Sequence, residues 1–292
     1  MNSTSSFWKI SLLAMLLLAL LTASCVIDPD PDPDDDVRNH NYRASEEFDF
    51  SIDINGQTRL DLDATNGTVE ILAGADNNRV QIWGERRVES DSYSDAEYYL
   101  SKLAVDVTQY AGEIAVKTIQ PDNTRGRNFL VFYHIRIPQN WRVRADQQNG
   151  ELLIEGISGP VDVTQNNGEA TLHWIDNDLN ASLDNGNIFI SHHSGNADVS
   201  LINGNIDAAL DLLPAGGVCK LNSVNGQILL AIPRSTSAEF SAAVTNGNIA
   251  VNNLNLRNAQ TTPTRTTGIL GTGDGDVELK TINGNIVVNG VN

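Results

Sequence analysis

Apolar and polar residues alternate in short units that repeat through the second half of the chain. Counted from a turn glycine, the second and fourth residues are nearly always apolar and the sixth often is, as in Ala170, Leu172 and Trp174 after Gly168. Alternation with a period of two predicts a β-strand with one buried face. Repetition at a fixed period predicts a solenoid. The turn glycines fall on a nine-residue grid, with Asn177 in one place of it, at 150, 159, 168, 186, 195 and 204.

Asparagine precedes many of the turn glycines, and Asn-Gly suits a backbone with positive φ. The commonest spacing between Asn-Gly pairs is 18 residues, which predicts two units per coil. The asparagine side chains of equivalent turns are then expected to stack as a hydrogen-bonded ladder along the axis. A meander of hairpins is the alternative, but it does not require the same inward positions in successive units. The asparagines are Asn66, Asn149, Asn167, Asn185, Asn203, Asn225, Asn246 and Asn283.

The nine-residue grid also predicts which of the Cys, Trp and His side chains in the repeats are buried in the core. Cys219 lies two residues after Gly217 and is expected to be a small buried hydrophobe. Trp174 is assigned to the core, and His192, one coil further on, is expected to pack partly buried against it. A longer excursion at 252–267 interrupts the grid, and loops that leave a rigid scaffold often carry binding residues. Arg265 is therefore a candidate binding residue.

The section from 45 to 145 predicts longer strands, for example at 79–83, 113–118 and 129–137. One helix is predicted at 95–104, with Ser94 and Glu97 as a capping box and an apolar face from Ala96 to Leu103. We expect this section to cap the first coils of the solenoid, which occupies 146–292. The two sections together form one continuous predicted domain, 45–292.

The N-terminus has the pattern of a targeting segment. Lys9 precedes an apolar run, Ile10–Leu21, that is too short for an ordinary membrane-spanning helix. We expect residues 1–24 to be a signal peptide and Cys25, which follows small residues as in a bacterial lipobox, to be lipidated. The alternative is an ordinary secretion signal with an incidental cysteine. Val26, rather than aspartate, favours the outer membrane by resemblance to lipoprotein sorting rules, so the expected location is the cell envelope.

Residues 25–44 contain an alternating Asp-Pro run, Asp28–Asp34, followed by two more aspartates. Proline and charge repulsion predict an extended spacer between the membrane and the domain. Calcium binding is the alternative for this run, but alternating proline resists wrapping around an ion.

The formal net charge is −18, which argues against nucleic acid as a partner because binding phosphates requires Lys and Arg. With only two cysteines, one of them the expected lipidation site, a disulfide scaffold and a cysteine metal site are excluded. No cofactor and no metal are predicted.

The ordered motifs resemble a known family. The segment Tyr133–Pro138, then Asn149-Gly150-Glu151-Leu152, then repeated Asn-Gly-Asn-Ile, is similar to the bacterial putative-adhesin domain of unknown function across about 45–290. The resemblance implies an all-β fold, a right-handed β-helix or β-solenoid with an N-terminal β section and one short helix, with three short sheets per coil rather than two. It implies no catalytic residues.

These features favour a non-enzymatic cell-envelope lipoprotein that binds glycan or protein, with the membrane as partner through its lipid anchor. His173 and Phe189, outward by parity, are candidate binding residues for sugar. One alternative is an envelope-stress or regulatory scaffold that docks another protein. The other is a lyase-like enzyme acting on polysaccharide, against which the dispersed acids and scarce Lys and Arg across 145–255 argue.

Overall fold

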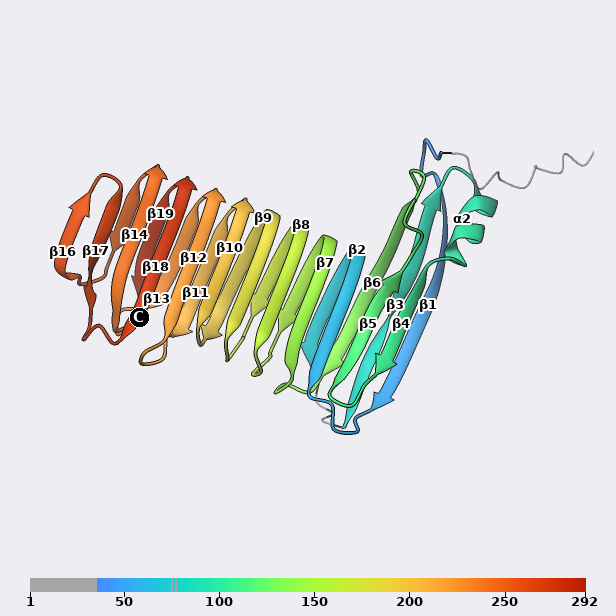
Figure 1. Cartoon of the computed structure of the whole chain (residues 1–292), viewed down its shortest axis with the longest axis horizontal. Helices are drawn as coiled ribbons and strands as arrows, with labels where there is room; N and C mark the ends of the chain where they lie inside the picture. Colours follow the sequence, from blue (N-terminus) through green and yellow to red (C-terminus); the bar gives the residue numbers. More distant parts are fainter. Residues whose placement is uncertain (1–35, 75, 77) are drawn as a thin grey trace, which may run out of the picture. The chain divides into compact units, whose positions relative to one another are not determined.

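The repeating units stack through parallel strand pairing with an offset of 18 residues. In the computed structural model, which describes residues 36–74, 76 and 78–292, Val143 pairs with Val161 and Val161 with Leu179. They belong to three successive coils, whose strands lie side by side (Figure 1). The strands are β7 (Arg142–Glu155), β8 (Val161–His173) and β9 (Leu179–Ser194), followed by β10 (Ala197–Asn203) with β11 (Ile206–Leu212) and β12 (Val218–Asn225) with β13 (Ile228–Pro233).

Each coil contributes to two parallel ladders, one formed before the Asn-Gly turn and one after it. β10 and β12 pair in the first ladder, and β11 and β13 pair in the second. The prediction of two units per coil is therefore confirmed, and the strands of the described residues form two ladders per coil rather than the three short sheets that the family resemblance implies. The all-β class and the single described helix are also confirmed, whereas the right-handed sense of the coil stays a prediction.

The order of strands in space departs from their order in sequence at both ends of the stack. β18 (Gly275–Asn283) lies between β12 and β14 (Ala238–Asn246), and β19 (Ile286–Val291) lies between β13 and β15 (Ile249–Asn252). At the other end, β2 (Arg59–Ala73) lies between β7 and the pair β5 (Glu113–Ile119) and β6 (Asn128–Ile137). A strand from near each end of the described chain is thus held between two neighbouring strands.

Antiparallel strands cover the terminal coils. β3 (Arg79–Ser90) pairs with β6, β1 (Tyr42–Asp53) pairs with β3, and β4 (Ala104–Gln109) pairs with β5. At the opposite end, β17 (Arg265–Leu270) pairs with β14, and β16 (Arg257–Thr262) pairs with β17. The excursion predicted as a loop at 252–267 is therefore largely a hairpin that extends the first ladder.

The predicted helix exists but begins earlier than expected. α2 spans Tyr93–Leu100, and Ser92 caps it by accepting a hydrogen bond from the backbone amide of Asp95. The expected capping box at Ser94 was wrong. Asp95, at 2% side-chain exposure, forms a two-pronged ion pair with the equally buried Arg127 at 2.7 and 2.8 Å. Among the described residues, no helix has the length and apolarity needed to span a membrane.

The predicted asparagine ladder is continuous through the stack. Each side-chain amide beyond Asn66 donates to the Oδ1 of the preceding asparagine at 2.7–2.9 Å, as Asn167 does to Asn149 and Asn185 does to Asn167. The Asn66 amide donates to the carbonyl oxygen of Phe129. The glycine after each asparagine has a positive φ, and a Cβ on Gly186 would lie 1.5 Å from the carbonyl oxygen of Gly168. The ladder in spatial order is Asn66, Asn149, Asn167, Asn185, Asn203, Asn225, Asn283 and Asn246.

The interior is apolar and includes Cys219, as predicted, and burial raises the pKa of its thiol to about 12. Two other core predictions were wrong. Trp174 is 48% exposed, and His192 is exposed, although their rings do stack on each other at 5.5 Å. Both residues have left-handed φ angles, 50° and 52°, which reverse the alternation of side chains. The following residue, His193, points inward instead and is fully buried.

Candidate functional site

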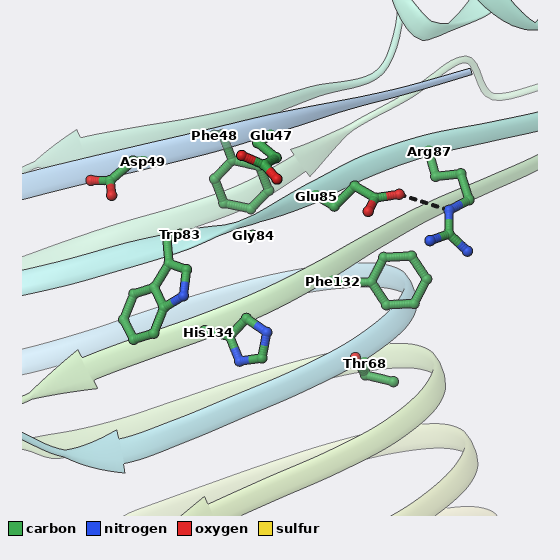
Figure 2. Close-up of a pocket in the computed structure, with 10 residues that line it drawn as sticks. All are labelled: Glu47, Phe48, Asp49, Thr68, Trp83, Gly84, Glu85, Arg87, Phe132 and His134. Atoms are coloured by element: carbon green, nitrogen blue, oxygen red, sulfur yellow. Dashed lines mark hydrogen bonds and ion pairs between the residues drawn. The ribbon is translucent and has the colours of Figure 1, made fainter. Parts of the chain in front are cut away.

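A hollow of 590 Å³ opens on the outer face of the second ladder, where β1, β3 and β6 join the stack (Figure 2). The side chains that face outward alternate along β3 and β6, so that Trp83 lies opposite His134 and Glu85 lies opposite Phe132. Antiparallel pairing therefore brings two aromatic side chains of β6 against β3. The lining residues are Glu47, Phe48, Asp49, Thr68, Trp83, Gly84, Glu85, Arg87, Phe132 and His134.

Gly84 shapes the floor of this hollow. A Cβ at this position would lie 1.7 Å from the carbonyl oxygen of Phe132 and 3.0 Å from the ring of Phe48. Phe48 pairs with Gly84 across the strands and packs edge-on against Tyr133 at 5.7 Å. Only glycine permits this approach, which lets the Phe48 ring lie over the backbone between Trp83 and Glu85.

Two aromatic rings form the centre of the site. The rings of Trp83 and His134 are stacked, with centroids 5.5 Å apart and planes 20° apart. The Arg136 guanidinium lies 5.5 Å from the Trp83 ring, and His134 Nδ1 makes a 2.6 Å contact with the Glu70 carboxylate. These contacts hold both rings in place.

Carboxylates surround the ring pair. Arg87 donates to Glu85 at 2.8 Å and lies 4.7 Å from the centre of the Phe132 ring. The hydrogen bond from Arg87 holds the pKa of Glu85 below its usual value, so Glu85 is ionised at neutral pH. Glu47 and Asp49 are exposed at the rim. The site therefore combines aromatic surface with several negatively charged hydrogen-bond acceptors.

The structure places the sequence-predicted binding residues in two separate regions. Phe189 is 38% exposed on the outer face of the second ladder, and His173 lies beside it on the same face. Arg265 pairs with Ala243 in the first ladder, at the far end of the stack, and so does not join them. Cys25 lies outside the described residues.

Trp83 and His134 were not among the binding residues predicted from the sequence. The alternation of apolar and polar residues in 128–137 could have indicated part of this site, because it points Phe132 and His134 to the same outer face. Trp83 lies beside them because β3 pairs with β6. The nine-residue spacing of the repeats gives no information about this pairing. In the part of the chain that the structure describes, no group of three His, Cys, Asp or Glu side chains is placed to hold a metal ion.

The family model Toastrack DUF4097 matches residues 105–289, which includes Phe132 and His134 but not Trp83. No curated protein matches the chain.

Solved structures with a similar arrangement are distant. A putative cell adhesion protein from Clostridium sporogenes is 12% identical, with 85% of this chain and 100% of that chain covered and a TM-score of 0.38. A putative adhesin from Parabacteroides merdae is 16% identical, with 88% and 100% covered and a TM-score of 0.35. A putative lipid binding protein from Parabacteroides distasonis is 13% identical, with 84% and 97% covered and a TM-score of 0.29. Likeness at this level carries no argument about function.

Proposed function

The chain belongs to the Toastrack DUF4097 family, and we propose that it is a non-enzymatic cell-surface domain that binds glycan through the Trp83–His134 hollow. The observation that carries this proposal is the fixed ring pair bordered by carboxylates. Aromatic rings offer a flat apolar surface to the C–H faces of a sugar, and carboxylates accept hydrogen bonds from its hydroxyl groups.

The strand pairing favours a glycan over an extended peptide. Peptides commonly bind a sheet by adding a strand to a free edge. The two strands that carry the ring pair offer no such edge, because β3 pairs with β1 and β6, and β6 pairs with β3 and β2. β1, at the rim, pairs only with β3 among the described strands. A ligand lying over the Trp83–His134 pair has to be recognised through side chains.

The charge of the hollow selects among glycans. The rim carries Glu47 and Asp49, whereas Arg87 is paired with Glu85 and Arg136 lies beside the Trp83 ring. Acidic groups still outnumber basic ones around the rings, so uronates and sulfated sugars should be disfavoured and an amine-bearing sugar favoured. We therefore propose glucosamine-type chains as the favoured class, with weaker binding of neutral chains and a loss of the amine preference at high salt.

Binding of the mature chain to glucosamine hexamer, cellohexaose, hexagalacturonate and hexalysine tests the proposal. The expected order is glucosamine hexamer, then cellohexaose, with no binding of hexagalacturonate. Trp83→Ala should weaken the first two at least tenfold. Tyr42→Ala, which removes an aromatic side chain that is 50% exposed outside the hollow, should leave them unchanged.

Other outcomes contradict the proposal in distinct ways. Equal affinity for hexalysine would point to a basic peptide and so to the docking scaffold. Cleavage of polygalacturonate in the presence of calcium would establish an enzyme. Failure of every glycan to bind would overturn the assignment of the hollow.

The anchor is a separate proposal. We propose that Cys25 carries lipid and holds the protein to the outer membrane, as supported by the apolar run and small residues before it. Cys25→Ser should move the protein from the membrane fraction to the soluble fraction. Retention of this variant in membranes would show that Cys25 is not the anchor.

A further inference from the structure

One outward row crosses the strands from the candidate site to Phe189. Trp83 lies opposite His134, and His134 lies opposite Glu70. The same row continues through the next three coils, in the order Leu153, Thr171 and Phe189. Five strand spacings of about 4.8 Å separate the first and last residues of this row, or about 24 Å.

The middle of the row is hollowed. A second hollow, of 480 Å³, shares Thr68 and His134 with the first, so the two lie next to each other. Leu153 and Thr171 lie in it between the ring pair and the position of Phe189. Along one side run Glu151 and Glu169, which are paired across β7 and β8 and exposed. Among the described residues, neither carboxylate has a salt-bridge partner.

The far end of the row is aromatic again. Phe189 is 38% exposed. In the neighbouring row, His173 contacts the Ser191 hydroxyl, and its ring lies 4.0 Å from that of Trp174. Trp174 stacks in turn on His192, which contacts Asp211 at 3.1 Å. The left-handed backbone at Trp174 and His192, which turns their side chains outward, thus forms an exposed aromatic cluster beside Phe189.

We infer that these features form one trough, from Trp83 to Phe189, that binds a linear glycan of several sugar units lying across the strands. This inference rests on the proposed function and specifies the length and direction of its ligand. The two aromatic ends supply stacking surfaces, and the Glu151–Glu169 wall accepts hydrogen bonds from the chain between them. The paired strands fix the distance between the ends, so a short oligomer cannot engage both.

Calorimetric titration of the mature chain with glucosamine oligomers of two to six units tests the trough. Affinity should rise at least tenfold from the dimer to the hexamer. Phe189→Ala should weaken the hexamer at least fivefold and leave the dimer unchanged, whereas Trp83→Ala should weaken both. Tyr42→Ala is the matched control, since it removes another exposed aromatic side chain that does not line either hollow.

The outcomes separate this inference from the proposed function. Suppose that Trp83→Ala weakens binding, but affinity does not depend on oligomer length or Phe189→Ala leaves hexamer binding unchanged. The hollow then binds glycan, but the proposed trough is wrong. If no oligomer binds, both are wrong. A Glu169→Gln variant should reduce the hexamer affinity and its salt dependence, and an unchanged salt dependence would exclude the carboxylate wall.

Discussion

The side-chain amide of Asn149 donates to Oδ1 of Asn66 at 2.7 Å, across 83 residues of sequence. The intervening chain builds β3 to β6, which cover the end of the stack beyond β2. This bond therefore joins the N-terminal section to the repeats as one ladder. The Trp83–His134 site lies just outside this junction, on strands that the repeat holds in position.

The ladder contributes measurably to stability. Asn167→Ala removes two side-chain hydrogen bonds, to Asn149 and from Asn185, and should lower the free energy of unfolding by about 1–2 kcal/mol. Urea denaturation measures the change. Asn222→Ala, an outward asparagine of β12 outside the ladder, should change it by less than about 0.5 kcal/mol. Equal effects of the two variants would show that the ladder adds nothing specific.

The turn glycines are required by the close approach of successive coils. Gly186 has φ 136°, and its added Cβ would meet the Gly168 carbonyl oxygen at 1.5 Å. Gly186→Ala should destabilise the domain by more than about 4 kcal/mol, measured by urea denaturation or as loss of folded protein. Gly112→Ala, where a Cβ would meet nothing within 4 Å, is the control and should fold normally. A stable Gly186→Ala protein would contradict the stacking geometry.

His193 should make the fold sensitive to mild acid. Its ring nitrogens lie 2.8 and 3.1 Å from the carbonyl oxygens of Ile175 and Asn196, but burial is the larger influence and lowers its pKa. The unfolded chain thus binds a proton more readily than the folded one. The resulting stability is full above the ordinary histidine pKa of about 6.5 and is lost as pH falls toward the lowered pKa of the folded state.

Urea denaturation between pH 7 and pH 5 measures this effect. The wild type and His192→Ala, which alters an exposed ring, should lose stability over this range. His193→Leu should lose less, whatever its stability at pH 7. The same pH dependence in His193→Leu would assign the effect to other groups.

The repeat was predictable because each unit has its own alternation of apolar and polar residues and its own turn residues. Alternation showed which residues of β8 to β13 face inward, and Asn-Gly marked the turns, so the ladder followed from the spacing alone. The reversal at Trp174 and His192 was not predictable, because neither left-handed residue is a glycine. The insertion of β2 and β18 between neighbouring strands could not be predicted either, since pairing between distant segments produces no local periodicity in the sequence.

The candidate site was predictable only in part. Parity correctly placed Phe189 and His173 on an outer face. Trp83 lies in the section without a regular grid, and only the register of β3 on β6 brings it to His134. Arg265 was expected in a free loop, whereas pairing with β14 holds it in a strand at the end of the stack, apart from Phe189 and His173.

The proposal that the Trp83–His134 hollow binds sugar can be tested with a crystal structure of the protein and glucosamine hexamer. We expect sugar rings over the Trp83–His134 pair, with the chain crossing the strands beside Glu151 and Glu169 toward Phe189. A hexamer bound elsewhere, for example on the first ladder or at the β16 edge, with the hollow empty, would contradict it.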